Sequence, residues 1–209
     1  MSKITAIEPQ KHNANRLSIS LDGAYAFSLD RITAAWLTVG RELGDLEIKK
    51  LLSKDEVENA CARVMRLLSH RARSRQELER YLQKHGYETA VREAVFVRLT
   101  DEGYLDDARF ASEWLDNRAT FRPRSHAQIR AELRQKGIAE DVIEETLASS
   151  PLSDAELALQ AARKAYRRFE KLDWQTFRVK MGNVLMRRGF GYSTAAEAVK
   201  QVWDENHPK

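Results

Sequence analysis

The sequence predicts a mainly α-helical protein in which tandem three-helix repeats form an elongated array, preceded by a small N-terminal β-hairpin segment. The first observation is a repeated glycine. Gly86, Gly137 and Gly189 lie 51 and 52 residues apart, each between a helical run ending in basic residues and a large apolar residue. The second is a series of helix-start signals from Ser53 onward, and the third is strand periodicity confined to the N-terminus. Tandem repeats stack and present an extended surface, which favours binding over catalysis.

Composition favours several small cores over one large core, because 43% of the 209 residues are hydrophobic and 32% are charged. No apolar run reaches the roughly 18 residues of a membrane-spanning helix, and the N-terminus lacks the pattern of a signal peptide. We therefore expect a cytoplasmic protein with no membrane contact. The single cysteine, Cys61, lies within an apolar helical pattern and is expected to pack in a core.

The N-terminal part, residues 1–52, is expected to begin with a small antiparallel sheet. Apolar residues alternate with small or polar ones at 3–7, 17–21 and 24–29. Asp22-Gly23 joins the last two of these stretches and is a strong signal for a two-residue hairpin turn. Short helices are expected at residues 31–39 and 45–52, with Gly40 and Gly44 between them.

Helices are predicted from residue 53 to the end of the chain. Capping boxes, in which a hydroxyl and a carboxylate or amide satisfy free N–H groups at a helix start, mark several of them. The boxes pair Ser53 with Glu56, Ser74 with Glu77, Ser125 with Gln128, Ser153 with Glu156, and Thr194 with Glu197. The predicted helices are 54–71, 74–85, 88–102, 107–119, 125–136, 139–149, 154–170, 174–188 and 194–205. They group into repeats 53–105, 106–152 and 153–209. The repeated glycines end the second helix of each repeat, where a left-handed conformation is preferred.

Basic residues concentrate at or near the end of the first helix of each repeat, although the net charge is only +4. The candidate partner-binding or DNA-binding residues are Arg63, Arg66, Arg71, Arg73, Arg75, Arg118, Arg122, Arg124, Arg163, Lys164, Arg167 and Arg168. One reading is that such cations complement helix dipoles and solvate the surface. The other is a binding role for the recurring Arg-Ser turns, because rows of guanidinium groups suit carboxylates or phosphates. Lys84, Lys136, Arg187 and Arg188, before the glycines, are explained by the helix dipole alone.

Three ordered motifs connect these residues to a known family. Residues 71–78 read Arg-x-Arg-Ser-x-x-Glu-Leu, residues 99–111 read Leu-x-x-x-Gly-Tyr-Leu-Asp-Asp-x-Arg-Phe-Ala, and residues 129–138 read Ile-x-x-Glu-Leu-x-x-Lys-Gly-Ile. This series resembles the RecX regulators of the RecA recombinase, most strongly over residues 53–150. The N-terminal hairpin and the third repeat agree in layout with weaker motifs. In the third repeat Asp173 and Trp174 stand where the Arg-Ser pair would be, so no role of that pair carries over there.

The resemblance implies a non-enzymatic protein of tandem three-helix repeats that lodges in the helical groove of the RecA–DNA filament. It implies inhibition of ATP hydrolysis, strand exchange and filament extension, and hence modulation of recombination, DNA repair and the SOS response. The implied partners are the RecA filament and single- or double-stranded DNA within it. We expect the chain to act as a monomer without a cofactor.

Other functions have less support in the sequence. No phosphate-binding loop, dinucleotide fingerprint, nucleophile elbow or Cys-x-x-Cys motif occurs, so no catalytic residue is assigned. The histidines are dispersed and predict no metal site; they are His12, His70, His85, His126 and His207. Direct DNA binding by helix pairs acting like helix-turn-helix readers is the alternative function. An enzyme with an unrecognised site is a third class, which no motif supports.

Overall fold

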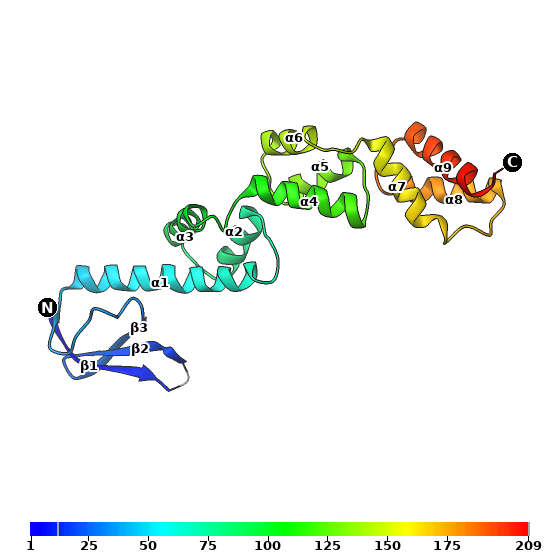
Figure 1. Ribbon diagram of the computed structural model, residues 1–209. Helices are drawn as coiled ribbons and strands as arrows, with labels where there is room; N and C mark the ends of the chain where they lie inside the picture. Colours follow the sequence, from blue (N-terminus) through cyan, green and yellow to red (C-terminus); the bar gives the residue numbers. More distant parts are fainter. Residues whose placement is uncertain (12, 209) are drawn as a thin grey trace. The chain divides into compact units, whose positions relative to one another are not determined.

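The computed structural model describes residues 1–11 and 13–208, which form two compact units. The first unit comprises Met1–Arg73 with Leu78–Leu105, and the second comprises Ser74–Glu77 with Asp106–Lys209. A small sheet comes first along the chain, and helices follow it (Figure 1). The predicted fold class, mainly α with three-helix repeats in tandem behind a small antiparallel sheet, is confirmed.

The sheet has four antiparallel strands in the order β3-β2-β1-β4. They are β1 Ser2–Gln10, β2 Asn13–Leu21, β3 Ala24–Asp30 and β4 Glu42–Leu43. Asp22 and Gly23 connect β2 to β3 with φ angles of 50° and 87°. Two consecutive positive φ values are the geometry of a hairpin turn that matches the twist of the strands. The predicted hairpin and the predicted third strand are therefore confirmed.

The segment between the sheet and the repeats differs from the prediction. α1 runs from Asp45 to Leu68 without a break, so Ser53 caps no helix and the predicted helices 45–52 and 54–71 are one. No glycine or proline interrupts this stretch, and an uninterrupted helix keeps its backbone hydrogen bonds. Residues 31–36 form turns rather than a helix, because the chain must extend again for Glu42 and Leu43 to pair with β1.

α1 contributes to two cores of the first unit. Leu51 in its N-terminal half packs with the apolar face of the sheet, and Figure 1 shows the sheet lying along this half of the helix. Cys61 and Val64 in its C-terminal half pack in the core of the first repeat. The two halves of one helix therefore connect the N-terminal sheet to the first repeat.

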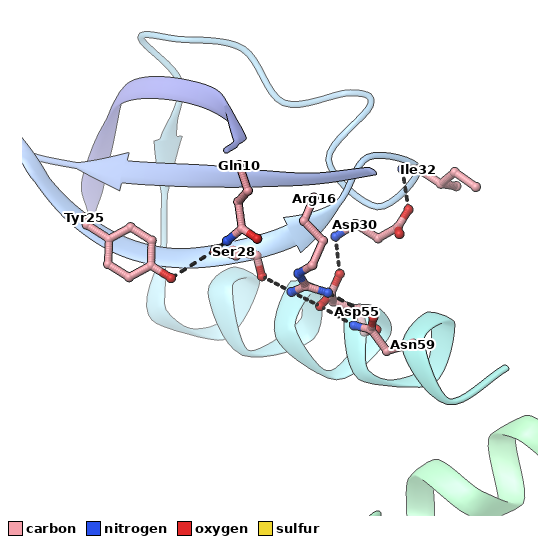
Figure 2. A network of polar contacts seen from close by, with 8 residues as sticks. All are labelled: Gln10, Arg16, Tyr25, Ser28, Asp30, Ile32, Asp55 and Asn59. Carbon is pink, nitrogen blue, oxygen red and sulfur yellow. Dashed lines mark hydrogen bonds and ion pairs between the residues drawn. The ribbon is translucent and has the colours of Figure 1, made fainter. Parts of the chain in front are cut away.

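A polar network joins the sheet to α1 (Figure 2). The carboxylate of Asp55, which is 5% exposed, accepts hydrogen bonds from Arg16 Nη2 and Asn59 Nδ2, both at 2.9 Å, and from the backbone N–H of Asp30. Arg16 Nη1 also donates to Asn59 Oδ1 at 3.0 Å, and Nη2 donates to the carbonyl of Ser28 at 2.8 Å. A buried carboxylate that is paired with a cation and fully hydrogen-bonded has a structural role and is not a reactive group. Asp55 lies 39 positions after Arg16, so the sequence pattern did not predict this pair.

The remaining helices form the repeats. They are α2 Arg75–Lys84, α3 Thr89–Asp101, α4 Asp107–Phe121, α5 His126–Gln135, α6 Glu140–Ala148, α7 Asp154–Tyr166, α8 Trp174–Met186 and α9 Tyr192–Asn206. Separate apolar cores lie in the first, second and third repeats, around Phe96, Ile129 and Phe177 respectively. The expectation of several small cores is confirmed.

Most helix-boundary predictions hold. Gly86, Gly137 and Gly189 have φ angles of 81°, 78° and 88° at the ends of α2, α5 and α8. Ser153 forms a complete capping box with Glu156. The box predicted at Thr194 is wrong, because α9 already begins at Tyr192 behind Gly191.

Cys61 is expected to be unreactive in the folded protein. Its side chain is buried, and this burial raises the pKa of the thiol, which lowers the thiolate fraction that would react. At pH 8 an aromatic disulfide reagent should label Cys61 at least about 100-fold more slowly in buffer than in 8 M urea. Labelling at the same rate in both conditions would contradict the buried placement.

Candidate partner and nucleic-acid interface

The Arg-Ser turns lead into the second helix of the first and second repeats. Ser74 and Ser125 are fully buried, and each hydroxyl accepts a hydrogen bond from a backbone N–H in the first helical turn. The donors are Glu77 N at 3.3 Å and Gln128 N at 3.2 Å. These serines therefore cap α2 and α5.

The same serines also contact the end of another helix in the second unit. Ser74 Oγ donates to the carbonyl of Lys136 at 2.6 Å, and the backbone N–H of Ser125 donates to the carbonyl of Arg188 at 3.1 Å. Lys136 and Arg188 each precede one of the repeated glycines. The contacts satisfy carbonyl groups that a helix end leaves free. We call the first contact the Ser74 joint and the second the Ser125 joint.

Two aspartates complete these joints. The backbone N–H of Arg75 donates to Asp107 Oδ1 at 3.0 Å, and that of His126 donates to Asp154 Oδ1 at 2.8 Å. Asp107 and Asp154 are the first residues of α4 and α7. The neighbouring Asp106 caps α4 by accepting from Arg109 N at 2.9 Å. The serines and aspartates are thus structural, and the arginine side chains remain as the candidates for binding.

Glu132 holds two of the candidate arginines in the second repeat. Its buried carboxylate accepts from Arg118 Nε at 2.7 Å, from Trp114 Nε1 at 2.8 Å and from Arg124 Nη1. The guanidinium of Arg118 also lies 4.4 Å from the centre of the Trp114 ring. Glu132 stands in the family motif at residues 129–138, but its pairing with the candidates Arg118 and Arg124 was not predicted from the sequence.

Candidates in the third repeat are also partly engaged. Arg163 Nε donates to Glu205 Oε2 at 3.0 Å, and Lys164 Nζ donates to the carbonyl of Thr120. The Arg168 guanidinium lies 5.3 Å from the centre of the Phe169 ring. Arg168 also lines an open hollow with a volume of about 420 Å³. Its other lining residues include Lys180 and Arg187, and none of the lining residues is acidic.

The other candidates are more exposed. Arg66 and Arg71 donate to backbone carbonyls, those of Ala62 and Ala72. Arg73 is half-buried. Arg75 is exposed but interacts with other residues. Among these other candidates, Arg63, Arg122 and Arg167 are exposed and form no side-chain hydrogen bond or ion pair within the described part of the chain. Four of the twelve candidates, Arg63, Arg66, Arg71 and Arg73, belong to the first unit, and the other eight belong to the second.

Arg188 is a candidate that the sequence analysis assigned to the helix dipole. Its Nη1 atom is buried and has no hydrogen-bond acceptor among the described residues. Burial, together with repulsion from Arg124 and Arg122, lowers the pKa of its guanidinium. The sequence already indicated a missing partner. When the repeats are aligned, Arg188 takes the position of Lys136, and the neutral Gln128 takes the position of the acidic Glu77.

Neither a metal centre nor a membrane helix was located in what the structure describes. Residues 1–11 and 13–208 contain no group of three or more histidine, cysteine or acidic side chains that could hold a metal ion. In the same residues no helix combines the length and the apolar character needed to cross a bilayer. His12, one of the dispersed histidines, lies outside the described residues.

Comparison with known proteins gives a consistent result over the whole chain. The family model described as the regulatory protein RecX N-terminal domain matches residues 2–44. Those for the first, second and third three-helix domains of RecX match residues 60–99, 106–147 and 153–199. Together they account for most of the sequence, including the third repeat with its weaker motifs.

Individual relatives agree. The regulatory protein RecX of Bacillus subtilis (strain 168) is 34% identical, with 99% of this chain and 79% of the relative covered. That of Bacillus velezensis is 32% identical, with 99% and 80% covered. A crystal structure of a regulatory protein RecX is 28% identical and superposes with a TM-score of 0.71 over 96% of this chain and all of that chain. The RecX structure from Lactobacillus salivarius shares the fold, with a TM-score of 0.59 at 19% identity over 71% of this chain and 97% of that chain. The resemblance in the sequence motifs is confirmed, and the chain belongs to the RecX family of regulatory proteins.

Proposed function

We propose that this chain is a non-enzymatic regulator that binds the RecA–DNA filament in its helical groove and inhibits ATP hydrolysis and strand exchange. In this way it would modulate recombination and DNA repair, acting as a cytoplasmic monomer. The observation that carries the proposal is the match of all four parts of the chain to the RecX family. The partner in this proposal is the RecA filament, with single- or double-stranded DNA inside it.

Exposed arginines in successive repeats support binding to a repetitive polymer. Each of the three repeats has an exposed arginine without a side-chain hydrogen bond or ion pair among residues 1–11 and 13–208; these are Arg63, Arg122 and Arg167. Guanidinium groups suit carboxylates and phosphates, both of which a protein–DNA filament offers at regular intervals. Once one contact with the polymer has formed, the effective concentration of the next contact is high. Several weak contacts can therefore give a high overall affinity. Inhibition then requires only that the chain binds one filament state more tightly than the state that turns over ATP.

The decisive experiment is a titration of this protein into RecA hydrolysing ATP on single-stranded DNA. The proposal predicts inhibition that saturates and that requires binding to the filament, which co-sedimentation would report. An unchanged ATPase rate at a protein excess that saturates co-sedimentation would refute the inhibitory role.

The exposed arginines are expected to contribute to this inhibition. Replacing Arg63, Arg122 and Arg167 together by Ala should raise the concentration for half-inhibition at least about tenfold, because each side chain forms its charge-assisted contact only with the partner. Circular dichroism should show unchanged helical content, since these side chains have no hydrogen bond or ion pair to other described residues.

The matched control removes three arginines whose charges are already paired. Arg109, Arg130 and Arg134 pair with Glu113, Glu144 and Glu140 respectively. Their replacement by Ala removes the same formal charge from the chain and should change inhibition much less. Equal losses in both triple variants would mean that net charge, rather than the three unpaired positions, determines binding.

Direct DNA binding is the second candidate function. It is favoured by the hollow of about 420 Å³ in the third repeat, where Arg168, Lys180 and Arg187 are lining residues and no acidic side chain takes part. Binding to phosphates should weaken steeply with salt, whereas filament binding should depend on the recombinase and its nucleotide. If free DNA binds as tightly as RecA-coated DNA across a salt titration, the direct mode becomes the primary function.

A further inference from the structure

The two serine joints of the second unit connect equivalent positions of the repeats, but they use different donor atoms of the serine and differ in charge. In the Ser74 joint, Lys136 supplies the backbone carbonyl that accepts from Ser74, and its Nζ forms an ion pair with Glu77 Oε1 at 2.7 Å. In the Ser125 joint, Arg188 supplies the carbonyl that accepts from Ser125 N. The residue three positions after each capping serine is Glu77 in one joint and Gln128 in the other. The second joint therefore has the cation without the carboxylate.

Arg188 is placed where that carboxylate would be needed. A Cβ built on the adjacent Gly189 would lie 2.8 Å from Gln128 Cβ, so the side chain of Gln128 lies at the same helix end as Arg188. Gln128 carries no charge, and Arg188 Nη1 is buried without an acceptor among the described residues. A buried donor without a partner is costly, most of all when it is charged.

Nearby charges add to this imbalance. Arg122 and Arg124 lie close enough to repel the guanidinium of Arg188 and, after burial, are the causes that lower its pKa. The carboxylate nearest to Arg124 is that of Glu132, which is shared with Arg118. One carboxylate thus pairs with two arginines, while Arg122 and Arg188 form no ion pair with any carboxylate of residues 1–11 and 13–208. Such a group of cations is stable only when an anion or solvent offsets the repulsion.

We propose that Arg122, Arg124 and Arg188 bind a phosphodiester group of a nucleic-acid strand at the Ser125 joint. A phosphodiester supplies one negative charge and two free oxygens, which accept hydrogen bonds from several guanidinium groups at once. The preceding residue, Arg187, is the C-cap of α8 and lines the basic hollow with Arg168 and Lys180, so the same helix end has cations for a neighbouring phosphate. A strand of regularly spaced phosphates matches two such sites better than an isolated carboxylate does. The inference rests on the proposed function only in taking DNA within the filament as the source of the strand.

The first test measures binding of a fluorescein-labelled oligothymidylate to the full chain by anisotropy, without recombinase. Arg188→Gln should weaken binding about tenfold and reduce the slope of log affinity against log salt by about 0.7, the value for one phosphate contact on a single strand. Arg134→Gln is the control, because it removes the same charge from an exposed arginine paired with Glu140. Equal affinities for wild type and Arg188→Gln would overturn the proposal.

The second test restores the missing carboxylate. Gln128→Glu should pair with Arg188 as Glu77 pairs with Lys136, and two opposite changes should follow. The ligand-free chain should melt at a higher temperature, while oligothymidylate affinity should fall about tenfold because the cation is already neutralised. Ala127→Glu is the matched control; it adds the same charge one residue earlier in the same helical turn, at an exposed position. If Gln128→Glu binds the oligonucleotide as tightly as Ala127→Glu, the proposal fails.

These outcomes can be told apart from failure of the proposed function. If Arg188→Gln loses ATPase inhibition but binds oligothymidylate like the wild type, the arginines meet an acidic protein surface, and the phosphodiester proposal is overturned while the regulatory function stands. If the wild type fails to inhibit RecA yet loses oligonucleotide affinity on Arg188→Gln, the proposed function falls and the phosphate site stands.

Discussion

Gly189→Ala is expected to destabilise the second unit by about 3 kcal/mol. The glycine has a φ of 88°, which costs an L-residue about 1 kcal/mol. A new Cβ would also lie 2.5 Å from Ser125 Oγ and 2.8 Å from Gln128 Cβ, closer than such atoms approach. Ser125 is a buried cap and the Cβ of Gln128 is fixed to the backbone of α5, so neither can move without disturbing the Ser125 joint. Urea unfolding followed by circular dichroism measures the loss.

Gly86→Ala is the matched control for this prediction. Gly86 has nearly the same φ, 81°, but a Cβ built on it has nothing within 4 Å. It should therefore cost only the conformational strain, about 1 kcal/mol. The difference between the two variants isolates the contact between Gly189 and α5. If both variants lose the same free energy of unfolding, the glycines are needed only for the backbone conformation at the helix end. The close packing at the joint then contributes nothing to stability.

Glu132→Ala is expected to destabilise the second unit by about 3 kcal/mol, because it removes the only carboxylate that pairs with Arg118 and Arg124 in the described structure. Glu132 is 8% exposed and also accepts the Trp114 indole N–H. Its loss leaves two partly buried guanidinium groups and an indole N–H without their acceptor, and each such group carries a desolvation penalty. Urea unfolding followed by circular dichroism again measures the effect.

Glu113→Ala provides the comparison. Glu113 pairs with Arg109 at 3.0 Å across one helical turn, and both side chains are more than half exposed. Such a surface pair contributes about 0.5 kcal/mol or less, so its removal should be nearly neutral. A cost for Glu132→Ala as small as that for Glu113→Ala would show that solvent, rather than Glu132, satisfies the arginines of the second repeat.

The Glu132 variant also bears on the binding site. Glu132 holds Arg124 through a hydrogen bond, and Arg124 is one of the three arginines proposed to bind a phosphodiester. The same carboxylate therefore orders a binding residue and removes part of its charge. This dual role explains why a candidate arginine can be paired in the free protein and still contribute to a site that takes up an anion.

Local sequence signals determined the helices, the hairpin and the three positive-φ glycines. Each depends on contacts within a few residues: Asp22-Gly23 forms a two-residue turn, Gly137 ends α5, and Ser153 caps α7 with Glu156. Such features follow from the conformational preferences of the residues themselves. They were sufficient to predict the fold class and, with the ordered motifs, the RecX family.

Local signals failed where tertiary contacts compete with them. Ser53 and Glu56 match a capping box, yet α1 continues through them because its two halves are buried in different cores. The partners of the candidate cations were also hidden, since Glu132 lies 14 residues from Arg118 and Glu205 lies 42 residues from Arg163. A periodic pattern shows which face of a helix is polar, but it does not specify which distant charge meets that face.

The amino-acid sequence was sufficient for most of the secondary structure, for the repeat and for the family, because those depend on short-range preferences and on motif order. The ion pairs that neutralise some of the cations became visible only in the folded structure. The structure showed that the serines cap helices, whereas the neighbouring arginines do not. It also showed that Arg188 has a buried donor without an acceptor among the described residues. The reason is physical: the energy of a charge is set by burial and by neighbours within a few ångströms, and folding brings those neighbours from remote parts of the chain.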